Sequence, residues 1–321
     1  MLMSRRSLIV GVSGQDGAYL AKRLLDRGDE VIGTSRDAQE CSFTRLRQLG
    51  IRDDIQLKSL APIDFRSVLV EIQQTLPDEI YFLAGQTSVG LSFEQPVECM
   101  QSIAGSILNF LEVIRLSNRD IRLFSAGSSE CFGETSEVER ASESSKFKPK
   151  SPYGVAKANA FWQVAAYREA YNIFACTGIL ANHESTLRSE RFVIKKIIQG
   201  IKKIKGGDEV SLKLGNCEIY RDWGWAPEYV VAIERMLDRR EATDYVIASG
   251  RTVCLRDFVR AAFNYAGLEM EDYLEYCHEW LRPCDIEKSY LDASKIKEEL
   301  GWEAKIEMKT IIEKMFNEEL Y

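Results

Sequence analysis

Short apolar runs alternate with segments of helical periodicity over the first 125 residues. Continuous apolar runs, typical of buried strands, lie at 7–12, 30–35, 55–60, 79–83 and 122–125. Between them, the spacing of apolar positions predicts helices over 18–27, 65–75 and 103–116. Strands that alternate with helices pair in parallel through right-handed crossovers. The pattern therefore predicts an α/β fold built on a doubly wound parallel sheet.

Helical patterns dominate from Tyr153 onward. One further buried strand is predicted at 173–180, and the predicted helices cover 153–171, 192–205, 227–239, 255–267, 294–300 and 308–316. We expect residues 1–180 to form the sheet domain, completed by a segment near 215–250. Residues 181–321 are expected to form a smaller, mostly helical domain that is interleaved with the first.

Composition places the chain among ordinary globular proteins and narrows its partners. The hydrophobic share is 45%, and 42 basic against 49 acidic residues give a net charge of −7, so nothing indicates a nucleic-acid partner. The eight cysteines form no CxxC pair, which suits a reducing cytosol and predicts no metal site. No segment approaches about 18 consecutive apolar residues. Neither a membrane span nor, after Arg5 and Arg6, an export signal is expected, and the predicted location is cytoplasmic.

A glycine-rich turn follows the first predicted strand and opens the first predicted helix. It reads Gly11-Val-Ser-Gly14-Gln-Asp-Gly17. Such turns let the backbone approach a pyrophosphate, and the helix N-terminus offers free N–H groups. The GxxGxxG spacing thus predicts a Rossmann domain that binds a dinucleotide, with a βα turn without a ligand as the alternative.

The end of the second predicted strand bears on which dinucleotide binds. A carboxylate at this position typically binds the ribose 2′-hydroxyl of NAD, whereas an arginine accommodates the 2′-phosphate of NADP. Here Ser35 takes the acidic position and Arg36 follows it. This favours NADP over NAD, although Asp37 leaves open an ion pair with Arg36 or a contact with the ribose.

Two further motifs supply groups for oxidation at a carbon that bears a hydroxyl. Tyr153 and Lys157 lie four residues apart at the start of a predicted helix, so both side chains share one face. A nearby cation stabilises a phenolate and makes tyrosine usable as a base. Ser128 and Glu130 follow the fifth predicted strand, where ligands collect in such folds. A plain alcohol dehydrogenase does not need the carboxylate of Glu130.

With these motifs in place, the sequence resembles the extended short-chain dehydrogenase/reductase family and, within it, the GDP-mannose 4,6-dehydratases. The resemblance runs from Gly11 to about Phe316. It is carried by 14–17, 77–81, 128–130, 151–153 with Lys157, 167–171, 182–185, 221–224, 282–283 and 300–302. The Asn-His-Glu-Ser and Arg-Asp-Trp-Gly segments are specific to this branch, whereas the glycine turn and YxxxK are not.

The resemblance implies a reaction that returns its cofactor unchanged. Tyr153 takes the proton of the C4 hydroxyl while hydride passes from C4 to NADP, and the resulting ketone acidifies the C5 hydrogen. Glu130 removes that proton, water leaves from C6 with Glu130 or Tyr153 as the acid, and hydride returns to C6. The product implied is a 4-keto-6-deoxy sugar. A C4 epimerase, a 4-keto reductase, a dehydratase for another GDP-sugar such as a heptose, or a non-enzymatic NADP sensor are the alternatives.

The resemblance also assigns the remaining site residues. Catalytic roles fall to Ser128, Glu130, Tyr153 and Lys157. The cofactor-binding set implied is Gly11, Gly14, Gln15, Asp16, Gly17, Arg36, Asp64, Leu83, Ala84, Gln86, Tyr153, Lys157, His183 and Arg188. The substrate-binding set implied is Ser88, Ser129, Glu130, Asn182, Val193, Lys196, Arg221, Arg282 and Asp285, with Val193 and Lys196 near guanine and the arginines on the diphosphate. Relatives pair as homodimers or homotetramers through the 153–171 and 103–116 helices.

Three departures from the family pattern stand out. Leu187-Arg188-Ser189-Glu190 replaces Arg-Arg-Gly-Glu in a segment that reaches a neighbouring subunit's cofactor in relatives, which weakens the expectation of a tetramer. Gln86-Thr87-Ser88-Val89 replaces Gln-Ser-His-Val, which suggests a related sugar. Ala61 or Pro62 stands where an aspartate commonly contacts adenine, with Asp64 as the alternative.

Overall fold

A seven-stranded parallel sheet forms the centre of the protein, in a computed structural model that describes residues 4–117, 119–280 and 282–321. Its strand order is β10-β6-β5-β4-β1-β2-β3. The strands are β1 (Arg6–Val10), β2 (Glu30–Ser35), β3 (Gln56–Ser59), β4 (Glu79–Phe82), β5 (Arg122–Ala126), β6 (Ala175–Leu180) and β10 (Tyr245–Ile247). The predicted α/β class with a doubly wound sheet is confirmed. The strand order reverses between β1 and β4, the point at which such sheets bind ligands.

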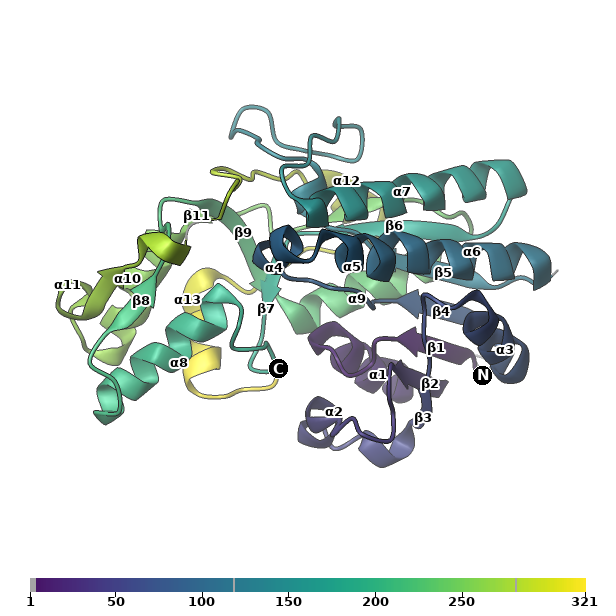
Figure 1. Cartoon of the computed structure of the whole chain (residues 1–321), viewed down its shortest axis with the longest axis horizontal. Coiled ribbons are helices and arrows are strands. Elements are labelled where there is room, and N and C mark those ends of the chain that lie inside the picture. The colour runs from purple at the N-terminus through teal and green to yellow at the C-terminus, as the bar shows by residue number, and fades with distance from the viewer. Residues whose placement is uncertain (1–3, 118, 281) are drawn as a thin grey trace.

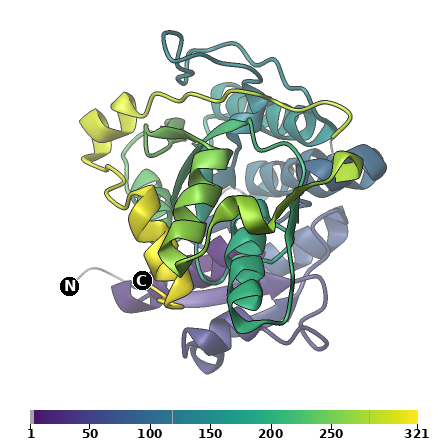
Figure 2. The same ribbon diagram turned by 90° about the vertical axis from the view of Figure 1, so that its left-hand side faces the viewer.

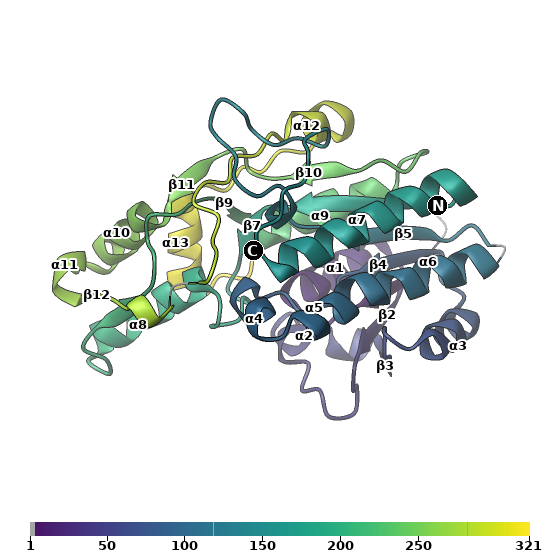
Figure 3. The ribbon, with the colours of Figure 1, turned by 45° about the horizontal axis from the view of Figure 1, so that its top comes forward.

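Helices cover both faces of this sheet (Figures 1 and 3). One face carries α1 (Gln15–Arg27) and α9 (Ala226–Leu237), and the other carries α3 (Phe65–Thr75), α6 (Ser106–Ser117) and α7 (Pro152–Tyr171). Strand side chains alternate between the two cores: Ile9 belongs to the first, whereas Leu8 and Val10 belong to the second. Burial on both faces explains why the strands read as continuous apolar runs.

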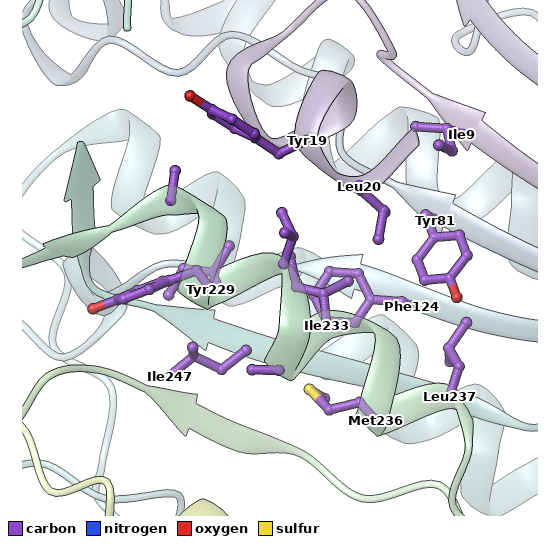
Figure 4. Packing of buried hydrophobic residues seen from close by; sticks show 14 of the residues in the cluster. Ile9, Tyr19, Leu20, Tyr81, Phe124, Tyr229, Ile233, Met236, Leu237 and Ile247 are labelled. Atoms are coloured by element: carbon purple, nitrogen blue, oxygen red, sulfur yellow. The ribbon is translucent and has the colours of Figure 1, made fainter. Parts of the chain in front are cut away.

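The core between the sheet and α9 is shown in Figure 4. Tyr229, Ile233 and Met236 come from α9, and they pack in one cluster with Ile9 of β1 and Phe124 of β5. All five side chains are almost fully buried. Although α9 lies late in the chain, it therefore belongs to the sheet layer, and it ties the two halves of the sequence together.

A second lobe has a hydrophobic core of its own, facing the viewer in Figure 2. Its helices are α8 (Val193–Gly206), α10 (Leu255–Ala266), α11 (Met270–Tyr273) and α13 (Met308–Phe316). Two small sheets join them, β11 (Thr252–Cys254), β9 (Tyr220–Trp225) and β7 (Asn182–Glu184) in one, β12 (Leu274–Tyr276) and β8 (Leu212–Leu214) in the other. We propose a second domain over 181–321, interleaved with the first because α9, β10 and α12 (Ser294–Leu300) return to the sheet.

The helix predicted over 103–116 is part of a longer, irregular helical run. Short helices α4 (Val89–Glu94) and α5 (Pro96–Met100) and a π-helical turn over Gln101–Gly105 precede α6. The run Pro96–Ser117 is long and apolar enough to cross a membrane by length and composition, but half of it is buried inside the fold. Core helices of globular proteins meet the same criterion, and the inner face of α6 lies in the second core.

Candidate active site

A cavity of about 340 Å³ lies where the carboxyl ends of the central strands face the second lobe. Both lobes contribute to its wall, which contains fourteen of the predicted site residues. They are Asp16, Leu83, Ser88, Ser128, Glu130, Tyr153, Lys157, Asn182, His183, Arg188, Val193, Lys196, Arg221 and Arg282. The fold thus brings together residues from opposite ends of the chain.

Tyr153 and Lys157 enter this cavity from the first turns of α7. Ser151 caps the helix by accepting a hydrogen bond from the N–H of Gly154 at 3.0 Å, and Pro152 occupies the first turn. Lys157 Nζ donates to the carbonyl oxygen of Ala126 at 2.7 Å, at the end of β5. Burial lowers the pKa of Lys157 to about 8 and raises the pKa of Tyr153, which contact with Ser128 opposes. The bound cofactor's positive charge would favour the phenolate.

Glu130 reaches the same cavity from the turn after β5. Ser128 caps this turn by accepting a hydrogen bond from the N–H of Glu130 at 3.3 Å. Gly154 lets α7 approach the turn, because a Cβ at this position would lie 2.8 Å from the carbonyl oxygen of Glu130. The Glu130 side chain is buried, which raises its pKa, while Arg221 and Arg282 act in the opposite direction. Glu130 therefore lines the same cavity as Tyr153, as predicted.

A pair of arginines lies on the second-lobe side. Arg221 projects from β9 and is 4% exposed; its Nη2 donates to Asp285 Oδ1 at 3.1 Å. Arg282 Nη1 donates to the same oxygen at 3.0 Å. Asp285 itself lies outside the cavity wall and links the two guanidinium groups. This geometry suits an anionic ligand with more than one phosphate, because planar guanidinium groups bind phosphate oxygens in pairs.

The glycine turn closes the opposite end of the cavity. Gly17 permits the close packing of α1 on the turn, since a Cβ there would lie 2.5 Å from the carbonyl oxygen of Gly11. Asp16 in the first turn of α1 lines the cavity, and its Oδ2 lies 2.9 Å from Nε2 of His183. This end matches the strand–turn–helix arrangement that holds a dinucleotide pyrophosphate.

Nine other predicted residues lie outside the cavity wall. They are Gly11, Gly14, Gln15, Gly17, Arg36, Asp64, Ala84, Gln86 and Ser129. Gln86 holds the backbone of Ser88 by donating to its carbonyl oxygen at 2.8 Å and accepting from its N–H at 2.6 Å. Asp64 caps α3 by accepting a hydrogen bond from the N–H of Arg66 at 3.1 Å.

Arg36 and Asp37 do not pair with each other. The side chain of Arg36 is 88% exposed and lies 3.9 Å from Glu98 Oε1. The carboxylate of Asp37 accepts hydrogen bonds from the backbone N–H groups of Gln39 and Glu40 at 2.9 and 3.2 Å. The structure therefore shows Asp37 stabilising its own loop rather than pairing with Arg36, and it leaves Arg36 with an exposed guanidinium group.

The sequence interpretation missed several residues of the wall. Trp280 lines the cavity, and its ring centroid lies 3.5 Å from Nζ of Lys196. Arg191 adds a cation, and Arg45 supports the glycine turn by donating to the carbonyl oxygen of Ser13 at 2.9 Å. No motif marks these residues, since they come from loops and from a helix too short to show periodicity.

The charge of the wall favours a ligand that carries several phosphates. Three carboxylates, those of Asp16, Glu130 and Glu184, face six cationic side chains. The cations are Lys157, Arg188, Arg191, Lys196, Arg221 and Arg282. Because the protein as a whole is acidic, this local excess of positive charge is a property of the site.

Comparisons with known proteins agree with this geometry. A family model described as GDP-mannose 4,6 dehydratase matches residues 8–315. "GDP-mannose 4,6 dehydratase 1" of Arabidopsis thaliana is 38% identical over 324 residues, covering 98% of this chain and 89% of that protein. "GDP-mannose 4,6-dehydratase" of Sinorhizobium fredii is 36% identical over 338 residues, covering 98% and 96%.

Solved structures share the fold at lower sequence identity. The dTDP-glucose 4,6-dehydratase of Bacillus anthracis, in complex with NAD, superposes with a TM-score of 0.85 at 17% identity and covers 98% of this chain and 96% of its own. RMD of Pseudomonas aeruginosa, complexed with NADPH, gives a TM-score of 0.79 at 20% identity, covering 98% and 97%. At these identities the likeness concerns the fold. The nearly complete match to the family model, together with the full-length relatives, shows that the chain belongs to the GDP-mannose 4,6-dehydratase family.

Proposed function

We propose that this protein is an NADP-dependent enzyme that converts GDP-mannose to GDP-4-keto-6-deoxymannose without net consumption of cofactor. The observation that carries the proposal is the position of Glu130, whose carboxylate lines the same cavity as Ser128, Tyr153 and Lys157. An enzyme that only oxidises and reduces C4 needs no carboxylate there, whereas removal of water requires a group that takes the C5 proton. Family membership supports the same reaction.

The residues present fit a dinucleotide. Asp16 of the glycine turn and Lys157 line one cavity with Tyr153, and these residues would hold the cofactor beside the sugar. When bound, NADP supplies a hydride acceptor and donor for C4 and C6 of the sugar. We propose NADP rather than NAD because Arg36 presents an exposed guanidinium group at the end of β2, where a 2′-phosphate is recognised.

Tyr153 acts first, as the base for the C4 hydroxyl. Its phenol is buried, so its pKa is raised, and a positive charge must approach before it can ionise. Lys157 holds a fixed position through Ala126 and supplies part of that charge. Ser128 contributes a hydroxyl that orients the substrate oxygen while Tyr153 takes the proton. The three residues together make the 4-keto form accessible.

Glu130 then acts on the ketone. The hydrogen on C5 is acidic beside a carbonyl group, and the carboxylate removes it. Burial raises the pKa of Glu130, which strengthens it as a base and allows it to return the proton to the hydroxyl that leaves C6. Its burial also keeps bulk water away from the intermediate.

Residues of the second lobe bind the nucleotide part of the substrate. Arg221 and Arg282, fixed by Asp285, bind the diphosphate, and Asn182 at the start of β7 lies in the same wall. Val193 and Lys196 on α8 approach the base. Asp285 already pairs with the buried Arg221, and a bound phosphate would add a second anionic partner to its guanidinium group.

Incubation of the enzyme with GDP-mannose and NADP, followed by mass spectrometry, tests the reaction. We expect a product lighter by one water, and no change in NADPH absorbance over the course. Glu130→Gln should lower the rate of water loss by roughly 10²-fold or more. Oxidation at C4 should remain detectable as reduced cofactor. Unimpaired turnover of Glu130→Gln, or stoichiometric consumption of NADPH, would contradict the proposal.

The segment with Thr87 and Ser88 raises the question of which sugar the enzyme accepts. Both line the cavity, in the segment where the sequence departs from the family pattern. A GDP-heptose in the same assay checks whether a larger sugar is preferred. Water loss from the heptose but not from GDP-mannose would assign the same chemistry to a different substrate.

We further propose that the enzyme is a cytoplasmic homodimer. All eight cysteines are free thiols, which suits a reducing compartment. The outer faces of α6 and α7 expose Leu108, Leu116, Val155 and Trp162, an apolar surface of the kind that pairs with a second copy.

A further inference from the structure

The glycine turn and the Asn-His-Glu-Ser segment are joined by side-chain hydrogen bonds. Gln15 Nε2 donates to the carbonyl oxygen of His183 at 3.2 Å, and Ser185 Oγ donates to Gln15 Oε1 at 2.7 Å. Gln15 and Ser185 are both buried. The glycine turn is therefore hydrogen-bonded to β7, the strand that begins with Asn182, and to the residue that follows it.

The ring of His183 makes the strongest of these connections. Nδ1 lies 2.8 Å from the carbonyl oxygen of Ala181, and Nε2 lies 2.9 Å from Oδ2 of Asp16. A carbonyl oxygen and a carboxylate oxygen can only accept hydrogen bonds, while a neutral imidazole has a single N–H. Both contacts are satisfied when the ring is doubly protonated, or when the Asp16 carboxyl carries the second proton instead.

The position of Asp16 decides between these two arrangements. Asp16 lies in the first turn of α1, where the helix dipole stabilises a negative charge. Burial alone would raise the pKa of the Asp16 carboxyl, but the adjacent His183 outweighs it and lowers the pKa to about 2. The proton between the two residues therefore belongs to the imidazole.

We propose that His183 is an imidazolium at neutral pH, which fixes Asp16 and cancels its negative charge where the pyrophosphate of the cofactor binds. It is a positioning residue, because it acts on the cofactor through the glycine turn. The proposal rests on the proposed function only in requiring a dinucleotide at that turn. It also couples the cofactor end of the cavity to Asn182 on the substrate side.

The groups around the ring set the pH range of this device. Asp16 faces it from α1, Glu184 and Arg188 lie beside it on its own segment, and the ring of Tyr229 from α9 stacks on it at 4.6 Å. Burial works against the charged ring and Arg188 adds to this, but Asp16 outweighs both, and the pKa of His183 is raised. The charged pair is therefore complete between the pKa of Asp16 and the ordinary imidazole pKa, and it is lost as the pH rises through the raised pKa of His183.

The protonation state is open to direct measurement because the chain has two histidines. We expect ¹⁵N NMR of the histidine-labelled protein to show one ring with both nitrogens protonated at pH 7, titrating above pH 6.5. His278→Gln assigns the remaining signal to His183, and Asp16→Asn should lower its pKa. A His183 ring with one protonated nitrogen at pH 7 would overturn the proposal.

The effect on the cofactor is measured without any sugar. The dissociation constant of NADPH, followed by fluorescence, should rise about tenfold in His183→Gln at pH 7. In the wild type it should rise more steeply between pH 7 and 9 than in the variant, where only the loss of charge on Lys157 remains. Tyr229→Phe keeps the stacked ring and serves as the matched control, with unchanged affinity. Equal NADPH affinity in the wild type and His183→Gln would refute the positioning role, and it would leave the dehydratase proposal untouched.

Discussion

At the scale of single residues, several buried ionisable groups lie in the cavity wall or next to it. Glu130 and Lys157 lie in the cavity wall, and Asp222 lies behind it in β9, next to Arg221. Burial favours the neutral form of each group. It lowers the pKa of Lys157 to about 8, raises the pKa of Asp222 to about 6 and raises the pKa of Glu130. Such shifts cost stability and are retained where charge is used.

Asp222→Asn is expected to stabilise the protein at neutral pH. Asp222 Oδ1 accepts a hydrogen bond from the N–H of Ser249 at 2.9 Å, which an amide oxygen preserves, while Oδ2 has no hydrogen-bond partner among the described residues. Because the folded-state pKa of Asp222 lies above that of the unfolded chain, its ionisation destabilises the fold increasingly from about pH 4 and fully above about pH 6. We expect a gain of about 2 to 3 kcal/mol at pH 7 that shrinks as the pH falls toward 4.

Urea unfolding across this pH range measures that gain. The exposed Asp208, changed to Asn, is the matched control and should show no comparable gap. A gain for Asp222→Asn that stayed constant with pH would assign its effect to packing rather than to ionisation.

Among site residues, those in motifs were predictable and those in irregular segments were not. Tyr153 and Lys157 were predicted because helix geometry alone places residues four apart on one face. Glu130 was predicted because it directly follows a strand whose carboxyl end faces the ligand. Trp280 and Arg45 were missed, since each reaches the site through tertiary packing that no local pattern encodes. His183 was assigned to the cofactor by resemblance, but its partner Asp16 emerged only from the fold.

At the scale of elements, length decided which predictions succeeded. Helices α3, α12 and α13 begin and end at the predicted residues, because their apolar periodicity marks their extent. Asp64 also caps the start of α3, and Gly301 ends α12. The three-residue strands β7, β8 and β12 carry too few positions to show an alternating pattern. Within α8, Lys195 is buried and donates to the carbonyl oxygen of Thr186 at 2.8 Å.

The contact between α7 and the Glu130 turn gives a prediction at this scale. Gly154→Ala would place a Cβ 2.8 Å from the Glu130 carbonyl oxygen and 3.0 Å from Pro149 Cβ, so the turn and the helix must separate. We expect kcat to fall by roughly tenfold or more, with a loss of stability of about 1 to 3 kcal/mol.

Gly206→Ala is the control for helix propensity, because its Cβ would meet only Asp208 Oδ2, at 3.5 Å. This variant should keep full activity and gain up to about 1 kcal/mol of stability. Steady-state kinetics and thermal unfolding of both variants check the pair. Full activity in Gly154→Ala would show that the α7 contact does not position Glu130.

At the scale of the whole molecule, the two helical layers on the sheet differ in whether further elements cover them. The α1–α9 face is continued by α12 and the second lobe, whereas α6 and α7 lie side by side with their outer surfaces uncovered (Figure 3). On that surface Val155 and Trp162, two turns apart on α7, are 43% and 62% exposed, and Leu116 on α6 is 52% exposed. Exposed apolar side chains at this density are typical of a surface that pairs with another protein.

Trp162→Glu tests whether this surface is the dimer interface. The substitution removes the indole that the interface would bury and places a charge there that must be desolvated. We therefore expect the variant to be a monomer. Light scattering after size exclusion should give twice the 36.6 kDa chain mass for the wild type and the chain mass for the variant. Val210→Glu, at a position 87% exposed on the second lobe, should remain a dimer. A variant that still dimerises would place the interface elsewhere, and a monomeric wild type would mean that there is none. A wild type of four chains would show that the segment Leu187–Glu190 supports a tetramer although Leu187 replaces an arginine of the family pattern.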